Sequence, residues 1–339
     1  MNNNLKKILN YLLFFGLAVL LLYFAFRKVD FNVIVTGFKE ANYFWVALSL
    51  IVSVFANLVR ALRWRLLMEP LGVVPSVKNV FGAVMIGYLA NFAFPRLGEI
   101  TKCGTLKKTD NVSFESLIGT VLVERASDLV MLFISVVLVF FIKIDFFGQF
   151  IIDKIFKPLY SNASGFSYIS ALLIISFLLF SYLILHLIRR NYFGHKIKSR
   201  VKSMLYGIID GLKSVVRMKN KGLFILYSFL IWGLYLLMTW LLVFSTKSTS
   251  ELTLVDSLFI MVVGSFGMVI PVQGGFGAFH IMTATGLGLF GISWEGGLVF
   301  ATIAHESQTI LIIALGVLSM FVLFLKRKPK HRLHNIIKQ

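Results

Sequence analysis

Six long apolar stretches constrain this chain more than any other feature of its sequence. The hydrocarbon core of a bilayer is about 30 Å thick, so a crossing α-helix needs about 20 residues. Stretches of about that length cover residues 8–26, 43–60, 117–142, 168–188, 223–244 and 297–325. Their residues are continuously apolar and do not alternate with polar ones, which argues against a β-barrel. The sequence therefore predicts an all-α polytopic membrane protein, with a single transmembrane domain over residues 1–339.

Two further apolar segments, residues 78–107 and 253–291, are interrupted by proline and glycine. The interruptions read GYLANFAFPRLGE at 87–99 and IPVQGGFGAFH at 270–280. Irregular backbone is tolerated at membrane depth only where it is buried in protein or lines a cavity. We therefore expect two re-entrant hairpins, each made of a broken helix that enters and leaves on the same side.

The 34 Lys and Arg residues outnumber the 15 Asp and Glu residues. The basic residues lie mainly between the apolar stretches, so we expect no nucleic-acid partner. If the N-terminus is internal and both hairpins are re-entrant, most basic residues fall in internal segments, as the positive-inside rule requires. This count puts Arg60, Arg63 and Lys102 in internal segments outside the spans, and it predicts that both termini are cytoplasmic.

The same layout predicts an internal repeat. Each interrupted segment is followed by a full span with a polar cluster, which reads ERASD at 124–128 and HESQT at 305–309. The first hairpin enters from inside and the second from outside, so the halves, approximately 43–188 and 223–325, form an inverted pair. Transporters place broken helices and a central site at such a repeat interface.

A basic segment at 191–221 connects the two halves. Its apolar residues recur at helical spacing, with Lys and Arg between them. We expect an amphipathic cytoplasmic helix on the inner leaflet. Its basic residues either attract anionic lipid or only fix the topology.

Several charged or ionisable residues fall within the apolar boundaries. They are Arg96, Glu99, Glu124, Arg125, Asp128, His280, His305 and Glu306. An ionised residue at the centre of a membrane helix costs about 2.5 to 3.5 kcal/mol, so it is normally paired or faces a watery cavity. Arg125 lies three residues before Asp128, which makes an ion pair within one helix available. The alternative to a functional site is a buried network that only locks helices together.

Three glycines in the second interruption, Gly274, Gly275 and Gly277, follow Pro271 and precede a helix. Backbone N–H groups freed by such a break, with the positive end of the helix dipole, favour a bound phosphate or carboxylate. His280 follows on the first turn, where it would contact the same anion, relay a proton or serve only as a packed structural residue.

No residue pattern indicates a cofactor. Cys103 is the single cysteine, so it excludes an intramolecular disulfide and matches no metal-ligand spacing. The chain has no nucleotide-binding glycine loop with a lysine, and no loop is long enough for a separate catalytic domain. We therefore predict no catalytic residues, no metal site and no cofactor.

Three motifs in this order resemble the lysylphosphatidylglycerol synthase transmembrane-domain family. They are PRLGE at 95–99, ERASD at 124–128 and PVQGGFG at 271–277, and the resemblance covers nearly the whole chain. The matched positions are Pro95, Arg96, Gly98, Glu99, Glu124, Arg125, Asp128, Pro271, Gly274, Gly275 and Gly277. The chain departs from the family at His280, where relatives usually have Glu. It also stops about a dozen residues after its last span, so it resembles a stand-alone member without the soluble aminoacyl-transferase domain.

The resemblance implies a multi-pass protein of the bacterial inner membrane with flippase-like activity. The leading hypothesis is a transporter that moves an anionic or glycosylated lipid headgroup between leaflets, with an anionic phospholipid or a polyprenyl-linked lipid as its partner. The alternatives are a membrane-embedded lipid-modifying transferase, with Glu124 or His280 as base, and a scaffold of a lipid-modification complex. The identity of the lipid, the direction and energy source of transport, and homo-oligomerisation all stay open.

Overall fold

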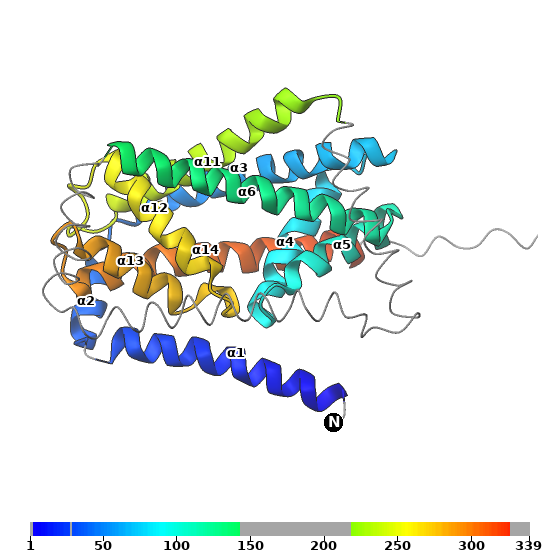
Figure 1. Ribbon diagram of the computed structural model, residues 1–339. Helices are drawn as coiled ribbons and strands as arrows, with labels where there is room; N and C mark the ends of the chain where they lie inside the picture. The colour runs from blue at the N-terminus through cyan, green and yellow to red at the C-terminus, as the bar shows by residue number, and fades with distance from the viewer. Residues whose placement is uncertain (1–2, 28, 143–217, 326–339) are drawn as a thin grey trace, which may run out of the picture. The chain divides into compact units, whose positions relative to one another are not determined.

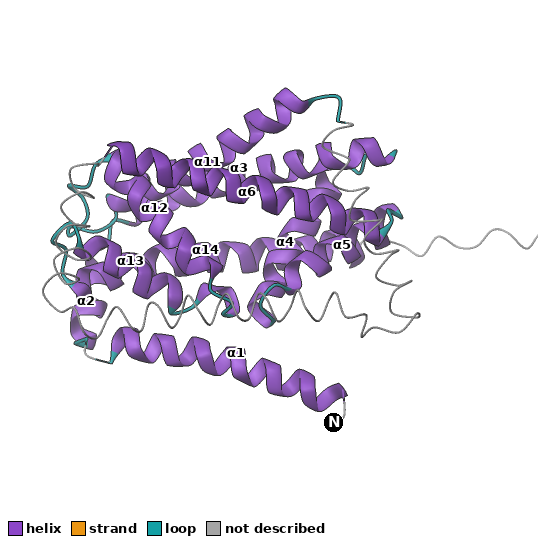
Figure 2. Cartoon of the chain, in the orientation of Figure 1, coloured by secondary structure: helices purple, strands orange, loops and turns teal. Residues whose placement is uncertain are grey.

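The computed structural model describes residues 3–27, 29–142 and 218–325, and its regular structure is entirely helical (Figures 1 and 2). The ten α-helices of this part of the chain are α1 (Asn3–Phe26), α2 (Phe31–Glu40), α3 (Tyr43–Met68), α4 (Val77–Ala93), α5 (Leu97–Asp110), α6 (Phe114–Ile142), α11 (Lys221–Val243), α12 (Leu254–Val269), α13 (Ala278–Gly288) and α14 (Trp294–Met320). The predicted all-α class is confirmed, and no strand occurs among the described residues.

The chain divides into two compact units. Residues 1–135 and 208–339 form the first, and residues 136–207 form the second. Apart from the last turns of α6, the second unit lies outside the described residues. The predicted span at 168–188 also lies outside them, as does nearly all of the basic segment 191–221.

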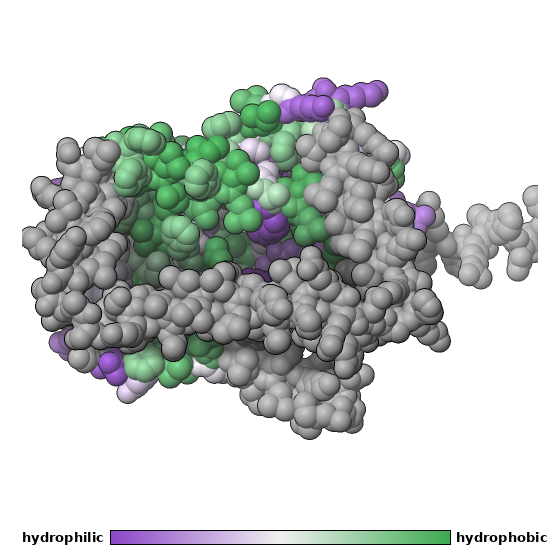
Figure 3. Space-filling view, in the orientation of Figure 1, coloured by the Kyte–Doolittle hydropathy of each residue, from purple (hydrophilic) through white to green (hydrophobic). Residues whose placement is uncertain are grey.

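Four described helices are long and apolar enough to cross a membrane. They cover Tyr43–Leu71, Phe114–Ile142, Lys221–Val243 and Trp294–Phe324. Their large apolar side chains are exposed to a degree that soluble proteins avoid, with Phe133 and Ile310 both 68% exposed. In Figure 3 the described residues that are visible form a mainly hydrophobic area with a few hydrophilic groups within it. This surface suits a protein surrounded by lipid.

Both predicted helix breaks occur, and each begins at the residue before a proline. A following proline disfavours the helical conformation of the residue that precedes it. Phe94, before Pro95, is accordingly extended at φ −143° and ψ 132°, and it ends α4. Ile270, before Pro271, is extended at φ −61° and ψ 128°, and it ends α12.

After each break the backbone turns through left-handed residues before the next helix starts. Arg96 has φ 63° and immediately precedes α5. Gly274, Gly275 and Gly277 have φ values of 57°, 81° and 76° and lead into α13. A left-handed conformation is unfavourable for most residues with a side chain and open to glycine, so the glycines at the second break follow from its geometry.

The first broken segment forms a tight helical hairpin. The Gly98 amide donates a hydrogen bond of 2.7 Å to the side-chain oxygen of Asn91 on α4, which satisfies one of the free N–H groups at the start of α5. A β-carbon at Gly98 would lie 2.4 Å from the Gly87 carbonyl oxygen. The two helices therefore approach each other through their glycines.

The hairpin packs against helices from the second half of the chain. Gly316 of α14 faces Leu89 of α4, and a β-carbon at that glycine would lie 2.8 Å from the Leu89 side chain. Two turns earlier on α14, Gln308 accepts a hydrogen bond of 2.7 Å from Ser53 of α3. α14 thus contacts both α3 and α4, which places segments more than 200 residues apart in sequence side by side (Figure 1).

The close approach within the hairpin predicts different effects on stability for two alanine substitutions on α5. Gly98→Ala should lower the stability by about 1 to 3 kcal/mol, because the new methyl group overlaps the α4 backbone. Gly104→Ala, where nothing lies within 4 Å of the added carbon, should be neutral or stabilise by up to about 1 kcal/mol. Thermal unfolding of the two variants in the same detergent tests the difference, and equal midpoints would contradict the hairpin.

Candidate functional site

A cluster of five charged side chains lies between three helices. Glu124 and Asp128 come from α6, Arg60 and Arg63 from α3, and Lys102 from α5. Arg60 is 2.8 Å from Glu124 and 2.5 Å from Asp128, while Arg63 is 2.6 Å from Asp128. Lys102 lies 2.5 Å from the second oxygen of Glu124. We call this set of five residues the central ion cluster.

Helical spacing explains why these residues converge. Glu124 and Asp128 are four residues apart, so they lie on one face of α6, and Arg60 and Arg63 share a face of α3 in the same way. Glu124 lies ten residues into α6, about 15 Å from its start at 1.5 Å per residue. Its side chain is fully buried. A lone carboxylate is very costly at such a site, and the basic groups around Glu124 compensate for its burial.

The cluster extends to polar and aromatic groups. Arg60 donates a hydrogen bond of 2.7 Å to the Tyr235 hydroxyl of α11. The Lys102 ammonium lies 4.3 Å from the ring centroid of Trp64, where the aromatic face attracts a cation. With three basic and two acidic members, the cluster carries a formal surplus of one positive charge.

Arg125 does not pair with Asp128, contrary to the expectation from their spacing. Asp128 is held between Arg60 and Arg63 on the α3 side, whereas Arg125 is one residue further along than Glu124 and therefore turned about 100° away from it. Arg125 instead lies 2.9 Å from Glu99 at the start of α5. The side chains of this pair are 44% and 25% exposed, whereas in the central ion cluster only Asp128, at 18%, is more than 8% exposed.

The sequence analysis did not anticipate the burial of three basic residues. It counted Arg60, Arg63 and Lys102 as charges of internal segments outside the spans. In the structure α3 continues to Met68, and all three side chains are at most 8% exposed. The signal that was missed is the helical pattern itself, because Trp64 and Leu67 continue the buried face of α3 past the arginines.

The two helix breaks contact each other. The rings of Phe92, just before the first break, and Phe276, in the second, have centroids 6.3 Å apart. Gln273 reaches across with its side-chain nitrogen 3.5 Å from the Ala93 carbonyl oxygen. The interruptions, 180 residues apart in sequence, thus lie side by side.

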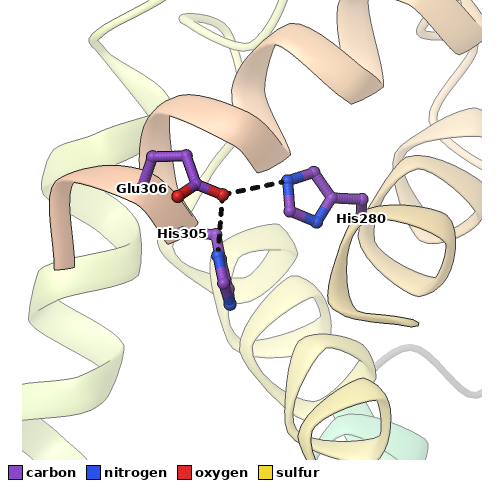
Figure 4. A group of neighbouring side chains, drawn as sticks. All are labelled: His280, His305 and Glu306. Carbon is purple, nitrogen blue, oxygen red and sulfur yellow. Dashed lines mark hydrogen bonds and ion pairs between the residues drawn. The ribbon is translucent and has the colours of Figure 1, made fainter. Parts of the chain in front are cut away.

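The second break also holds three ionisable side chains together (Figure 4). His305 Nε2 lies 2.8 Å from the Gly274 carbonyl oxygen, and His305 Nδ1 lies 3.1 Å from Glu306 Oε1. His280, from the first turn of α13, places its Nε2 atom 3.6 Å from the same Glu306 oxygen. We call these three residues the His–His–Glu cluster.

The predicted residues therefore separate into distinct sites. Glu124 and Asp128 belong to the central ion cluster, and Glu99 and Arg125 form the exposed pair. His280, His305 and Glu306 form the His–His–Glu cluster, while Arg96 is exposed at the start of α5. The predicted glycines surround the second break, but Gly277 faces α1, because a β-carbon there would lie 2.5 Å from Leu21.

The two halves contain comparable contacts of opposite polarity. In the first half an acid on the helix after the break, Glu99, contacts a base on the following long helix, Arg125. In the second half His280 takes the place of the acid and Glu306 that of the base. Each helix that follows a break is thus linked to the next long helix by an ionisable pair.

The buried position of Glu124 predicts a large loss of stability in Glu124→Gln. The change leaves Arg60 and Lys102 buried without their shared counter-charge, and breaking a buried ion pair costs about 3 to 5 kcal/mol. Glu115→Gln near the start of the same helix is the control, because Glu115 is exposed. Unfolding measurements should also show that Lys102→Met rescues part of the loss in the double variant. Strict additivity would contradict the pairing.

Comparison with known proteins agrees with the motifs. The family model described as the lysylphosphatidylglycerol synthase TM region matches residues 9–316. No curated protein and no solved structure gives a match. The matched range includes the central ion cluster, both helix breaks and the His–His–Glu cluster. The chain is therefore a member of the lysylphosphatidylglycerol synthase transmembrane-region family.

Proposed function

We propose that the protein is a flippase-like lipid transporter that moves an anionic or glycosylated lipid headgroup between leaflets. The observation that carries the proposal is the partly exposed ion pair of Arg125 and Glu99, at a position well inside the long, largely apolar helix α6. Arg125 lies eleven residues into α6, about 17 Å from its start. A charge at that depth is expected only where protein, water or a polar ligand solvates it.

The surroundings of the pair favour a lipid as that ligand. Leu122 and Leu129 on the same helix are 41% and 64% exposed. A lipid offers acyl chains to such side chains and a phosphate to the guanidinium, which binds phosphate oxygens in a bidentate manner. Arg96, exposed three residues before Glu99, would supply a second cation for the same headgroup.

The net charge of the central ion cluster also favours an anionic ligand at the Arg125–Glu99 pair. Its surplus positive charge is buried at low dielectric, where the field of a charge is screened less than in water. That field favours an anion beside Arg125. In the proposal, Glu99 holds Arg125 in place until a phosphate displaces it.

The contacting breaks would provide the moving parts. Transporters built from inverted repeats rock their halves about a site between broken helices, and we assign that role to halves at approximately 43–188 and 223–325. We further propose a bacterial inner membrane with both termini cytoplasmic, so that the basic segment 191–221 meets anionic lipid of the inner leaflet.

A lipid-modifying transferase is less well supported. Glu124 as general base would have to exchange Arg60 and Lys102 for substrate, although its side chain is fully buried between them. His280 is 1% exposed. A general base must come within hydrogen-bonding reach of the proton it removes.

Reconstitution in liposomes tests the transport proposal. Purified protein should accelerate the exchange of fluorescently labelled phosphatidylglycerol between leaflets, measured by quenching of the outer leaflet with dithionite. Arg125→Gln should slow the exchange about tenfold to a hundredfold, because it removes a charge-assisted bond to phosphate worth about 1.5 to 3 kcal/mol.

Lys247→Gln provides a matched control, because it too removes the basic member of an ion pair with a glutamate. Lys247 lies 3.0 Å from Glu40, but its side chain is 83% exposed. It should exchange lipid at the wild-type rate. The proposal is wrong if Arg125→Gln behaves like this control, or if wild-type protein accelerates neither phosphatidylglycerol nor a labelled polyprenyl phosphate.

A further inference from the structure

The His–His–Glu cluster has a proton arrangement that can be read from its neighbours. The Gly274 carbonyl oxygen can only accept a hydrogen bond, so His305 Nε2, at 2.8 Å, must carry a hydrogen. In the neutral imidazole the other nitrogen, Nδ1, then presents a lone pair. That lone pair points at Glu306 Oε1 from 3.1 Å, and two lone pairs at this distance require a positive centre between or beside them.

A proton on His305 Nδ1 would satisfy that contact alone and leave His280 unexplained. Its Nε2 atom lies 3.6 Å from the same carboxylate oxygen, which is beyond a hydrogen bond. Its Nδ1 atom is buried and has no hydrogen-bond partner. His280 Nε2 and His305 Nδ1 therefore face the same carboxylate oxygen of Glu306, so three potential metal-ligand atoms converge on one point.

The distances between these groups suit a metal ion. A donor atom from each of the three side chains lies within 4.8 Å of those from the other two. Zinc bound tetrahedrally at about 2.0 to 2.1 Å separates its ligand atoms by roughly 3.3 Å. The two measured separations, 3.1 and 3.6 Å, lie on either side of that value.

The surroundings resemble those of protein metal sites in two further respects. A histidine that binds a metal through one nitrogen usually donates its other N–H to a carbonyl or carboxylate, as His305 does to Gly274. The cluster is also enclosed by aromatic rings, with Phe276 and Phe279 centroids 5.0 and 5.3 Å from that of His305. Such a shell keeps water away and strengthens coordination.

We propose that His280, His305 and Glu306 bind one zinc-type divalent cation through His280 Nε2, His305 Nδ1 and Glu306 Oε1. Two imidazoles and one carboxylate are a donor set that zinc accepts with its fourth position open. Glu306 is the accessible member, with 35% of its side chain exposed against 1% and 6% for the two histidines. The open position therefore faces the Glu306 side, where it would take water or an anionic oxygen such as that of a phosphate.

This site could not be predicted from the sequence, because its three ligand residues do not follow a known metal-binding spacing. His305 and Glu306 are adjacent, and His280 is 25 residues earlier on another helix. Only the fold of the second break brings α13 and α14 together at this point. The inference is independent of lipid transport, because metal binding is measured on the purified protein without any lipid substrate.

Metal content measured by mass spectrometry tests the site directly. Tag-free wild-type protein, loaded with zinc and freed of excess metal by desalting, should retain about one zinc ion per chain. Glu306→Gln and His280→Ala should lower the zinc affinity about a hundredfold or more, since losing even an outer-shell partner costs tenfold to a hundredfold. Glu295→Gln, at the start of the same α14 helix, should bind like the wild type.

Cobalt substitution gives a second readout that does not depend on stability. Wild-type protein loaded with Co²⁺ should show the visible absorption bands of a four-coordinate site, and Glu306→Gln, at a partly exposed position, should lose them while eluting as folded protein in size-exclusion chromatography. The proposal is overturned if the wild type retains no zinc and shows no such bands, which would leave a proton as the bridging charge. It is equally overturned if Glu306→Gln and His280→Ala bind zinc as Glu295→Gln does.

Discussion

The burial of Glu124 determines much of this structure. A carboxylate at that depth in α6 requires cations, and they come from two other helices as Arg60 and Lys102. The requirement ties α3, α5 and α6 together and fixes how each is rotated about its axis. It also explains how α5, which is short and rich in polar residues, packs against the other helices: its Lys102 forms a buried ion pair with Glu124. Apolar packing alone would not specify these rotations, because lipid and side chains are equally apolar.

Much of the fold follows from local rules that a sequence displays. The length of the apolar stretches predicted the long helices that the structure describes. Pro95 and Pro271 predicted where α4 and α12 end, because each helix stops at the residue before its proline. The partners of the charged residues did not follow in the same way. Whether Arg125 pairs with Glu99 or with Asp128 depends on how α6 is rotated relative to α5. Contacts between the helices set that rotation, so the sequence alone does not predict the pair. The end of α3 was placed too early because hydropathy penalises an arginine whose counter-charge lies 64 residues away.

The two sites that attract charge differ in their access to the surroundings. The central ion cluster is mostly buried and has one positive charge more than its negative charges balance, whereas the Arg125–Glu99 pair is more exposed. A fixed buried charge next to an accessible one can favour an anion without moving itself. This division separates the groups that maintain the fold from those available to a ligand, so substitutions in the first should affect stability and those in the second should affect binding.

The two breaks are built alike but are not covered alike. At the first, Phe94 and Arg96 are exposed. At the second, Val272 and Ala278 are buried against Ala18 of α1, and the backbone of Leu22 leaves Gly277 no room for a side chain. Among the described residues, the N-terminal helix α1 therefore packs against the second break and not against the first. Any motion that opens the second break has to displace α1, whereas among the described residues α1 makes no such contact with the first break.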